Sequence, residues 1–196
     1  MQIHTQNVII LPPTASTAAL ASMEKLMQSF GRTEAPAPAA AQSSSKPQIG
    51  DYWPGQGGFY AGDMRGDDGT VYGLIVSDCD TAKDVGTAKW GTDGERDLSQ
   101  WDGLDNTRRL VNECPAAKLA TNHTADEHKD FYLPARRELQ LAAANVPHLF
   151  GDDNWYWSST HYGQSTAWAV DFELGRTSRN FRYDEFRVRP VRRFIY

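Results

Sequence analysis

The stretch Asp130-Phe-Tyr-Leu-Pro-Ala-Arg-Arg-Glu-Leu139 decides the fold class, because it passes directly from one kind of element to another. Its first half predicts a short strand closed by Pro134, since proline has no N–H to donate to a neighbouring strand. Residues 135–144 predict a helix, and Glu138 lies in its first turn, where the helix dipole favours a carboxylate. A strand followed at once by a helix predicts an α+β domain.

Elements of both kinds are expected on either side of this stretch. Upstream, residues 58–65 and 70–77 predict two strands joined by the turn Gly66-Asp-Asp-Gly69. A helix is expected over residues 105–122, and Pro115 would kink or divide it. Downstream, strands are predicted over residues 155–159, 165–172 and 186–194. The prediction is a domain with two helices and small antiparallel or mixed sheets.

Residues 1–48 differ in composition from this domain, which is expected to span residues 49–196. Residues 2–11 predict a strand and residues 17–30 a helix. The large apolar residues of that helix have the spacing of a coiled-coil seam: Leu20, Met23, Met27 and Phe30. So short a seam does not hold a helix in water alone. We expect residues 1–32 to form a strand–helix anchor that assembles as a trimer or another homo-oligomer; the alternatives are docking on a larger assembly or on the chain's own domain. Residues 33–48, rich in Ala, Pro and Ser, predict a linker.

The charge and hydropathy of the chain exclude several classes of partner. A net charge of −5 argues against nucleic acid, whose binding proteins usually carry a clearly basic face. Arginines crowd residues 176–193, so phosphate binding stays open beside the favoured interpretation that they pair with acidic neighbours. No stretch approaches the roughly 20 apolar residues of a membrane span, and the first residues lack the basic start of a signal peptide. We therefore expect that the chain is made in a host cytoplasm and does not insert into a membrane.

An ordered set of motifs resembles the DUF1566 family of bacterial surface and prophage proteins. The set is Asp130 to Leu139, Tyr156-Trp-Ser-Ser-Thr160, Ala167-Trp-Ala-Val-Asp-Phe172 with Gly175, and Val188-Arg-Pro-Val-Arg-Arg-Phe194. Gly57-Gly-Phe-Tyr-Ala-Gly62 and Asp102-Gly-Leu-Asp-Asn-Thr107 also fit phage members. The motifs are similar, too, to the variable proteins of diversity-generating retroelements and to formylglycine-generating enzymes. The resemblance covers residues 49–196 and implies a C-type-lectin-like fold, in which the first and last strands come together.

Candidate chemistry other than binding finds little support in the sequence. Cys79 and Cys114 are too few for a disulfide framework or a zinc site, and two free buried thiols are favoured over one disulfide. Sugar-binding lectins of this fold use Glu-Pro-Asn or Gln-Pro-Asp with Trp-Asn-Asp to hold calcium, and the chain has none of these. The loop Gly151-Asp-Asp-Asn-Trp155 leaves calcium open, with a polar turn as the alternative. An oxidase would need two reactive cysteines near the C-terminal groove, and both cysteines lie upstream. We expect no catalytic residue, metal or cofactor.

Two segments between the motifs have the composition of a recognition surface. They are His161-Tyr-Gly-Gln-Ser-Thr166 and the stretch Arg176 to Glu185, and the retroelement-diversified relatives vary in this region. Tyr, Asn and Arg give rigid stacking and adaptable hydrogen bonds. We expect the following side chains to contact a ligand or partner: Tyr162, Gln164, Trp168, Arg179, Asn180, Arg182 and Tyr183. The alternatives are an ordinary solvated loop pair and, for Trp168, a place in the core.

The functional hypothesis follows from the layout of anchor, linker and head together with the resemblance. It is a non-enzymatic phage or prophage virion protein, associated with the tail or tail fibre. Its head would bind a host-surface protein or glycan, or another virion protein. The alternatives are a bacterial ligand-binding protein, diversified by a retroelement or not, and an oxidase like the formylglycine-generating enzyme.

Overall fold

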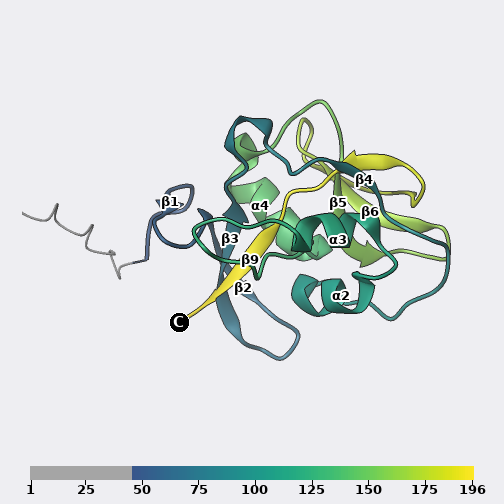
Figure 1. Cartoon of the computed structure of the whole chain (residues 1–196), viewed down its shortest axis with the longest axis horizontal. Helices are drawn as coiled ribbons and strands as arrows, with labels where there is room; N and C mark the ends of the chain where they lie inside the picture. The colour runs from purple at the N-terminus through teal and green to yellow at the C-terminus, as the bar shows by residue number, and fades with distance from the viewer. Residues whose placement is uncertain (1–45) are drawn as a thin grey trace, which may run out of the picture. The chain divides into compact units, whose positions relative to one another are not determined.

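The computed structural model describes residues 46–196, which lie within a compact unit running from Gln42 to Tyr196 (Figure 1). The expected anchor, with Leu20, Met23, Met27 and Phe30, and the linker up to residue 45 lie outside the described residues. The described part has three α-helices and two β-sheets, which confirms the α+β class. In this part, no helix has the length and apolar character needed to span a membrane.

The first sheet is antiparallel and has the strand order β1-β2-β3-β9. Its strands are β1 (Tyr52–Trp53), β2 (Gly58–Arg65), β3 (Val71–Ser77) and β9 (Val191–Ile195). The predicted hairpin of β2 and β3 is confirmed, and Gly69 has a φ of 84° in its turn, a backbone conformation that glycine adopts readily. β9 adds to the hairpin from the other end of the chain, with Leu74 opposite Arg193.

The second sheet is mixed and has the strand order β4-β8-β5-β6-β7. Its strands are β4 (Thr87–Lys89), β5 (Tyr156–His161), β6 (Thr166–Asp171), β7 (Arg176–Phe181) and β8 (Glu185–Arg187). β5 and β8 pair in parallel and the other neighbours are antiparallel. β6 and β7 form a hairpin in which Trp168 lies opposite Arg179.

Two expectations about the last part of the chain are wrong. The single strand expected over residues 186–194 is two strands, β8 and β9, which belong to different sheets. Val188 and Pro190 are buried in the segment between them, so the chain crosses from one sheet to the other through the core. The stretch 176–181 is the strand β7 and not a loop, because β6 offers it a full antiparallel ladder from Thr166 to Asp171.

One expected helix is divided in two and the other is confirmed. Pro115 divides the helix expected over residues 105–122 into α2 (Gly103–Leu110) and α3 (Pro115–Thr121), since proline fits the first turn of a helix but not its interior. α4 (Arg136–Asn145) confirms the helix expected over residues 135–144. The strand expected over residues 130–134 shrinks to one bridge, between Tyr132 and Val191. Two short 3-10 helices, η1 (Asp80–Ala82) and η2 (Pro147–Leu149), complete the elements.

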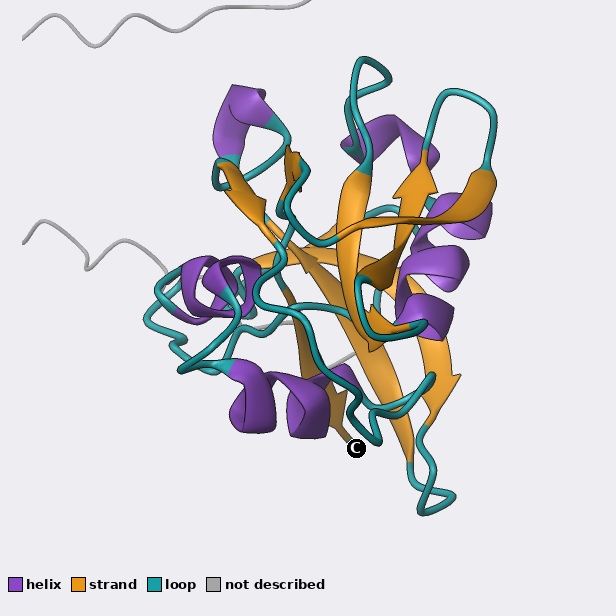
Figure 2. Ribbon diagram, turned by 90° about the vertical axis from the view of Figure 1, so that its right-hand side faces the viewer, coloured by secondary structure: helices purple, strands orange, loops and turns teal. Residues whose placement is uncertain are grey.

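The strands occupy the centre of the domain and the helices lie around them (Figure 2). One core cluster joins α4 to both sheets through residues such as Leu74, Leu139 and Val170. A second joins α2 and α3 to β5, and is filled by Trp90 and Trp157. Both indoles donate to backbone carbonyls, of Ser158 at 2.8 Å and Ala88 at 2.9 Å, so neither buried N–H lacks a partner.

A fully buried carboxylate, that of Glu138, ties these elements together. Its Oε1 accepts from the hydroxyls of Tyr72 at 2.5 Å and Tyr132 at 2.7 Å, and from Arg193 at 3.3 Å. Its Oε2 accepts from the backbone N–H of Ala135 at 2.7 Å and of Gly103 at 3.2 Å. Burial raises the pKa of Glu138, while the Arg193 charge and the donated hydrogen bonds act against that rise. The motif carboxylate therefore has the expected role in the fold.

The two ends of the described segment meet at one place. The Lys46 ammonium lies 2.5 Å from the Asp63 carboxylate on β2. It is also 5.1 Å from the centroids of the Tyr60 and Tyr196 rings. Residue 46 is thus held beside residue 196 by the edge of the first sheet.

Candidate recognition surface

Exposed aromatic rings and arginines gather on one face of the domain, beside the first turn of α4. We call this set the aromatic–arginine face. Three of its guanidinium groups lie over aromatic rings, and two further rings stack on one another. Its members are Trp101, Arg136, Arg137, Tyr162, Trp168, Arg179, Phe181 and Tyr183.

Trp168 forms the centre of the face. It lies on β6, and the Arg136 guanidinium carbon is 3.8 Å from the centroid of its ring. Tyr162 packs edge-on against it, with ring centroids 5.2 Å apart. Arg179 lies opposite Trp168 on β7 and reaches Tyr162, with its Nη1 2.7 Å from the hydroxyl and its guanidinium 4.8 Å from the ring centroid. The four side chains form one continuous chain of contacts.

Arg137 and Trp101 extend the face across α4. The Arg137 guanidinium lies 5.3 Å from the centroid of the Trp101 ring. Its backbone N–H donates to the Gln100 carbonyl at 2.9 Å, which fixes the loop before α2 against the start of α4. Gln140 accepts from Arg137 and donates to Thr177 on β7 at 3.0 Å, so the helix is tied to the sheet at this edge.

Phe181 and Tyr183 form the apolar end of the face. Their rings stack with centroids 5.1 Å apart and an interplanar angle of 9°. The exposed fractions of the large rings are high: 43% for Trp101, 49% for Tyr162, 50% for Phe181 and 61% for Tyr183. Rings of this size are seldom left in water side by side, so their grouping favours an interaction surface.

The position at which α4 begins explains why the sheet is uncovered here. Leu139 and Ala142 pack on Val170 in the same core cluster. Trp168 and Val170 are two residues apart on β6, so their side chains point to the same side of the sheet. On that side α4 begins at Arg136, which lies over Trp168. Beyond that first turn, no helix of residues 46–196 covers the sheet, so Arg179 and Phe181 are exposed and Trp168 is half-buried.

The side chains that were expected to contact a partner have different surroundings in the structure. Tyr162 contacts both Trp168 and Arg179, and Trp168 is half-buried on the same side of the sheet as Val170 but does not belong to a core cluster. Tyr183 is exposed beside them. Gln164 is exposed in the β5–β6 turn, where its backbone carbonyl accepts from Gly94 at 2.9 Å. Asn180 pairs with Ala167, in the alternate register to Arg179, and is half-buried.

Arg182 is a correction to that set, because its side chain is 1% exposed. Its guanidinium donates to the backbone carbonyls of Thr92 at 2.8 Å, Gly163 at 2.6 Å and Thr166 at 3.4 Å. It also lies 4.5 Å from the centroid of the Trp90 ring. Arg182 therefore holds the turn beneath the face and does not meet a partner directly.

Sequence reasoning missed four members of the face. Arg136 and Arg137 stand in the helix motif and were assigned to the fold, and Trp101 stands outside every predicted segment. Phe181 lies inside the stretch 176–185 but is not among the residues expected to make contact. A signal was present for Phe181, since it alternates with Arg179 and Tyr183; none was present for Trp101, which tertiary packing brings to α4.

A hollow beside Tyr162 borders the face. It is lined by Glu95, Arg96, Asp97, His161, Tyr162 and Gly163. Arg96 forms an ion pair with Glu113, and the buried Nδ1 of His161 has no hydrogen-bond partner among the described residues. Burial and the charge of Arg182 lower the pKa of His161, so its imidazole is neutral at pH 7. The carboxylates of Glu95 and Asp97 make the surface acidic on this side of the face.

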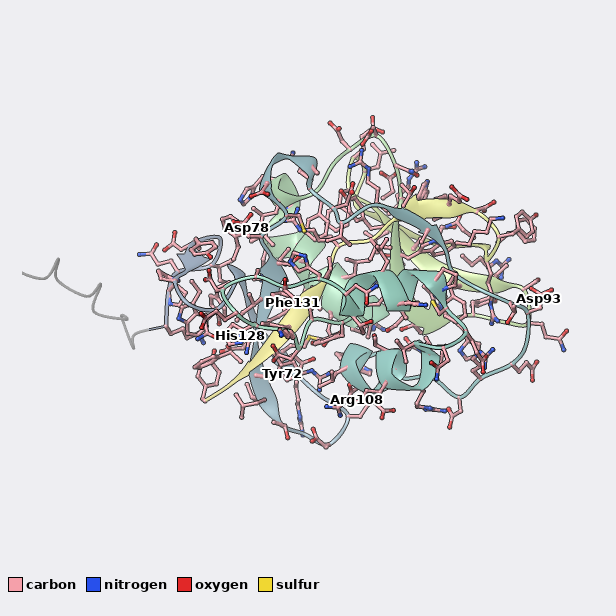
Figure 3. The ribbon with its side chains drawn as sticks, in the orientation of Figure 1. Tyr72, Asp78, Asp93, Arg108, His128 and Phe131 are labelled. Atoms are coloured by element: carbon pink, nitrogen blue, oxygen red, sulfur yellow. The ribbon has the colours of Figure 1, made fainter. Side chains whose placement is uncertain are left out.

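A second hollow lies at the opposite end of the domain and has a structural explanation. It is lined by Gly55, Asp126, Glu127 and His128. Figure 3 shows His128 far from Asp93, which lies two residues before Glu95 of the first hollow. The Asp126 carboxylate accepts from the Tyr52 hydroxyl at 2.7 Å and from the N–H groups of Gly55 and Gly57 at 3.0 Å each. These bonds, that of Tyr52 first, lower the pKa of Asp126. They join the turn before β2 to the loop after α3.

The loop considered for calcium is tied by an ion pair. Asp153 lies 2.7 Å from Arg187, which also pairs with Asp84, and the Asn154 side chain accepts from the N–H of Trp155 at 2.8 Å. Among residues 46–196, no group of three or more His, Cys, Asp or Glu side chains is placed to hold a metal ion.

Both cysteines are free and buried, as the favoured alternative predicted. Cys114 caps α3, since its Sγ accepts from the N–H of Ala117 at 3.3 Å. Burial raises the pKa of Cys114 to about 12 and also raises that of Cys79.

No protein-family model matches the chain, and no curated protein matches it significantly. The resemblance to the DUF1566 family therefore stays a prediction.

Proposed function

We propose that residues 46–196 form a non-enzymatic, C-type-lectin-like binding domain of a phage or prophage virion protein associated with the tail. The topology supports the fold: the hairpin of β2 and β3 takes up β9 from the other end of the chain, and a second, mixed sheet carries the exposed face. The ligand in this proposal is a host-surface protein or glycan, or another virion protein, and residues 1–32 assemble the chain as a homo-oligomer.

The observation that carries the binding role is the aromatic–arginine face. Trp, Tyr and Arg are the residues most enriched at the energetic centres of interfaces. Here Tyr162, Trp168 and Arg179 hold one another in place, so little conformational entropy remains to be lost on binding. A preorganised group of this kind supports binding better than a solvated loop pair does.

The state of the cysteines supports a binding role over the oxidase alternative. Catalytic cysteines react as thiolates, and their surroundings lower the pKa. Burial has the opposite effect on Cys79 and Cys114, and the Sγ of Cys114 is occupied as a helix cap.

Two measurements test the proposal. Mass spectrometry of purified particles is expected to detect the chain, and its absence from particles would sink the virion assignment. The purified full-length protein, added in excess, is expected to block adsorption of particles to host cells. The Trp168→Ala and Tyr162→Ala variants are expected to block at least about tenfold less well, because each removes a large aromatic ring from the aromatic–arginine face. Leu174→Ala removes an equally exposed apolar side chain outside the face and is expected to block as the unaltered protein does.

A further inference from the structure

Three arginines of the face have charges that no carboxylate of the described residues neutralises. Arg136, Arg137 and Arg179 form no ion pair within residues 46–196. Most other arginines of this part do pair with carboxylates: Arg96, Arg109, Arg176, Arg187, Arg192 and Arg193. In a chain of net charge −5, three unneutralised guanidiniums on one face mark a site complementary to negative charge.

The hydrogen-bond donors of these arginines are largely unused. The Nε atoms of Arg136 and Arg137 are buried and have no acceptor within residues 46–196. Arg136 and Arg137 each donate from Nη1 to a glutamine side chain, at 3.4 Å and 3.1 Å, and Arg179 donates from Nη1 to Tyr162. The Nη2 edge of each group makes no hydrogen bond with the described residues. A guanidinium stacked on a ring keeps its edge for bidentate bonds to a carboxylate.

The stacking also restricts what the ligand can be. A guanidinium group already lies over one face of each of the Trp101, Tyr162 and Trp168 rings, so fewer ring faces are available for a sugar or a nucleic-acid base to stack on. A nucleic acid also needs an extended row of phosphate contacts, and Glu95 and Asp97 border the face on one side. The exposed, stacked rings of Phe181 and Tyr183 fit an apolar side chain.

We infer that the aromatic–arginine face binds an acidic polypeptide, whose carboxylates pair with Arg136, Arg137 and Arg179 and whose neighbouring apolar side chain lies on Phe181 and Tyr183. This inference rests on the proposed binding function and names the partner class for the same surface. The carboxylates of this polypeptide lie beside Arg136 and Arg137 on α4 and beside Arg179 on β7.

A binding assay with defined polymers tests the inference on the full chain. The probes are a random copolymer of glutamate and tyrosine, polyglutamate, polygalacturonate and oligothymidylate. The copolymer is expected to bind most tightly, polyglutamate more weakly because it lacks the apolar contact, and the other two weakest. Binding is expected to weaken as salt rises, because exposed charge pairs are screened.

Matched charge changes locate the site. Arg137→Gln and Arg179→Gln are each expected to weaken copolymer binding about tenfold, the effect of losing one charge-assisted pair. Arg179→Lys keeps the charge but loses the planar fork, so it is expected to recover only part of that loss. Arg108→Gln removes an exposed arginine of α2 that also lacks a carboxylate partner among the described residues, and Figure 3 shows it away from Asp93. It is expected to bind within about twofold of the unaltered protein, because surface changes away from a site have small effects.

The results separate this inference from the proposed function. Tighter binding of polygalacturonate or oligothymidylate than of the copolymer would overturn it, and so would an equal loss in Arg108→Gln and Arg179→Gln. If no polymer binds while the protein still blocks particle adsorption, the acidic partner is wrong and the binding function stands. If the copolymer binds with the expected pattern while particles lack the chain, the virion assignment fails and the acidic partner stands.

Discussion

Glu138 shows how a single buried charge can organise a small domain. It receives hydrogen bonds from β3, from the segment before α4, from the starts of α2 and α4, and from β9. Removing one partner from a buried charged network costs more than the network contributes as a whole, because the other partners stay buried and unpaired. The carboxylate therefore specifies the arrangement of these segments more than it adds to stability.

Glu138→Gln is expected to lower the free energy of unfolding by about 3 kcal/mol, because Arg193 keeps only Asp102 of its two carboxylate partners and one tyrosine or backbone donor meets an amide N–H₂. Urea unfolding followed by tryptophan fluorescence measures this. Glu173→Gln changes an exposed carboxylate and is expected to leave the unfolding midpoint unchanged. Equal unfolding midpoints for the two variants would show that the hydrogen bonds of Glu138 do not organise the domain.

The two thiols are expected to resist modification in the folded protein. Burial raises the pKa of both, to about 12 for Cys114, so the reactive thiolate is scarce at pH 8 and the sulfur atoms are covered. A chromogenic disulfide reagent is expected to titrate almost no thiol in buffer, and both thiols of the chain in denaturant. Rapid labelling of one thiol in buffer would contradict its burial and revive the oxidase alternative.

At the scale of elements, the starts of α2 and α4 depend on a close approach at Gly103. A Cβ at this position would clash with Oε2 of Glu138 and lie 2.5 Å from the backbone nitrogen of Ala135. Only glycine lets the two helix starts share one carboxylate.

Gly103→Ala is therefore expected to destabilise the domain by about 1–3 kcal/mol, as an overpacked core does, although alanine favours a helix more than glycine does. Thermal unfolding followed by circular dichroism measures the loss. Gly163→Ala is the matched control, because the nearest atom to its Cβ would be 3.8 Å away, in the side chain of Thr166. A larger loss in Gly163→Ala than in Gly103→Ala would refute the close approach.

Elements with local signals could be predicted from the sequence, and elements defined by their neighbours could not. The hairpin of β2 and β3 and the helix α4 each have a turn or a start signal of their own. β7 lacks one: its Arg, Thr, Ser and Asn residues are typical of a loop, and only the ladder with β6 makes it a strand. The division of residues 186–194 between two sheets is likewise a property of the core.

The same distinction applies to the candidate site. Tyr162, Trp168 and Arg179 lie within one stretch of the chain, and composition was enough to select them. Arg182 has the same composition signal, yet its position under the β5–β6 turn makes it buried. Trp101 and Arg137 join the face only because the loop before α2 packs on α4, which no local pattern encodes.

At the scale of the whole domain, Arg189 links the two sheets. It lies between β8 and β9, is 2% exposed, and donates to the carbonyls of Ser77 at 2.6 Å and Leu149 at 2.9 Å. Ser77 ends β3 in the first sheet, while β8 belongs to the second. Arg189 therefore ties the segment that leaves the second sheet after β8 to the end of β3 in the first sheet and to η2.

Arg189→Met keeps an unbranched apolar stem but removes both bonds, so it is expected to lower stability by about 2 kcal/mol or more. The loss is expected as one shifted transition, the same by tryptophan fluorescence and by far-ultraviolet circular dichroism. Arg65→Met, which changes an exposed arginine at the end of β2, is expected to leave the transition in place. Two separated transitions in Arg189→Met would show that the sheets unfold independently.

The meeting of Lys46 with Tyr196 has a consequence for engineering. Because residues 46 and 196 lie beside each other, a short peptide could join them, and the chain could be opened instead at the turn between β2 and β3. Such a circular permutant keeps every pairing of both sheets. For the same reason the segment is suited to insertion into a surface loop of another protein, because its first and last residues lie close together. The fold can thus be transplanted as a cassette, with its aromatic and arginine side chains intact.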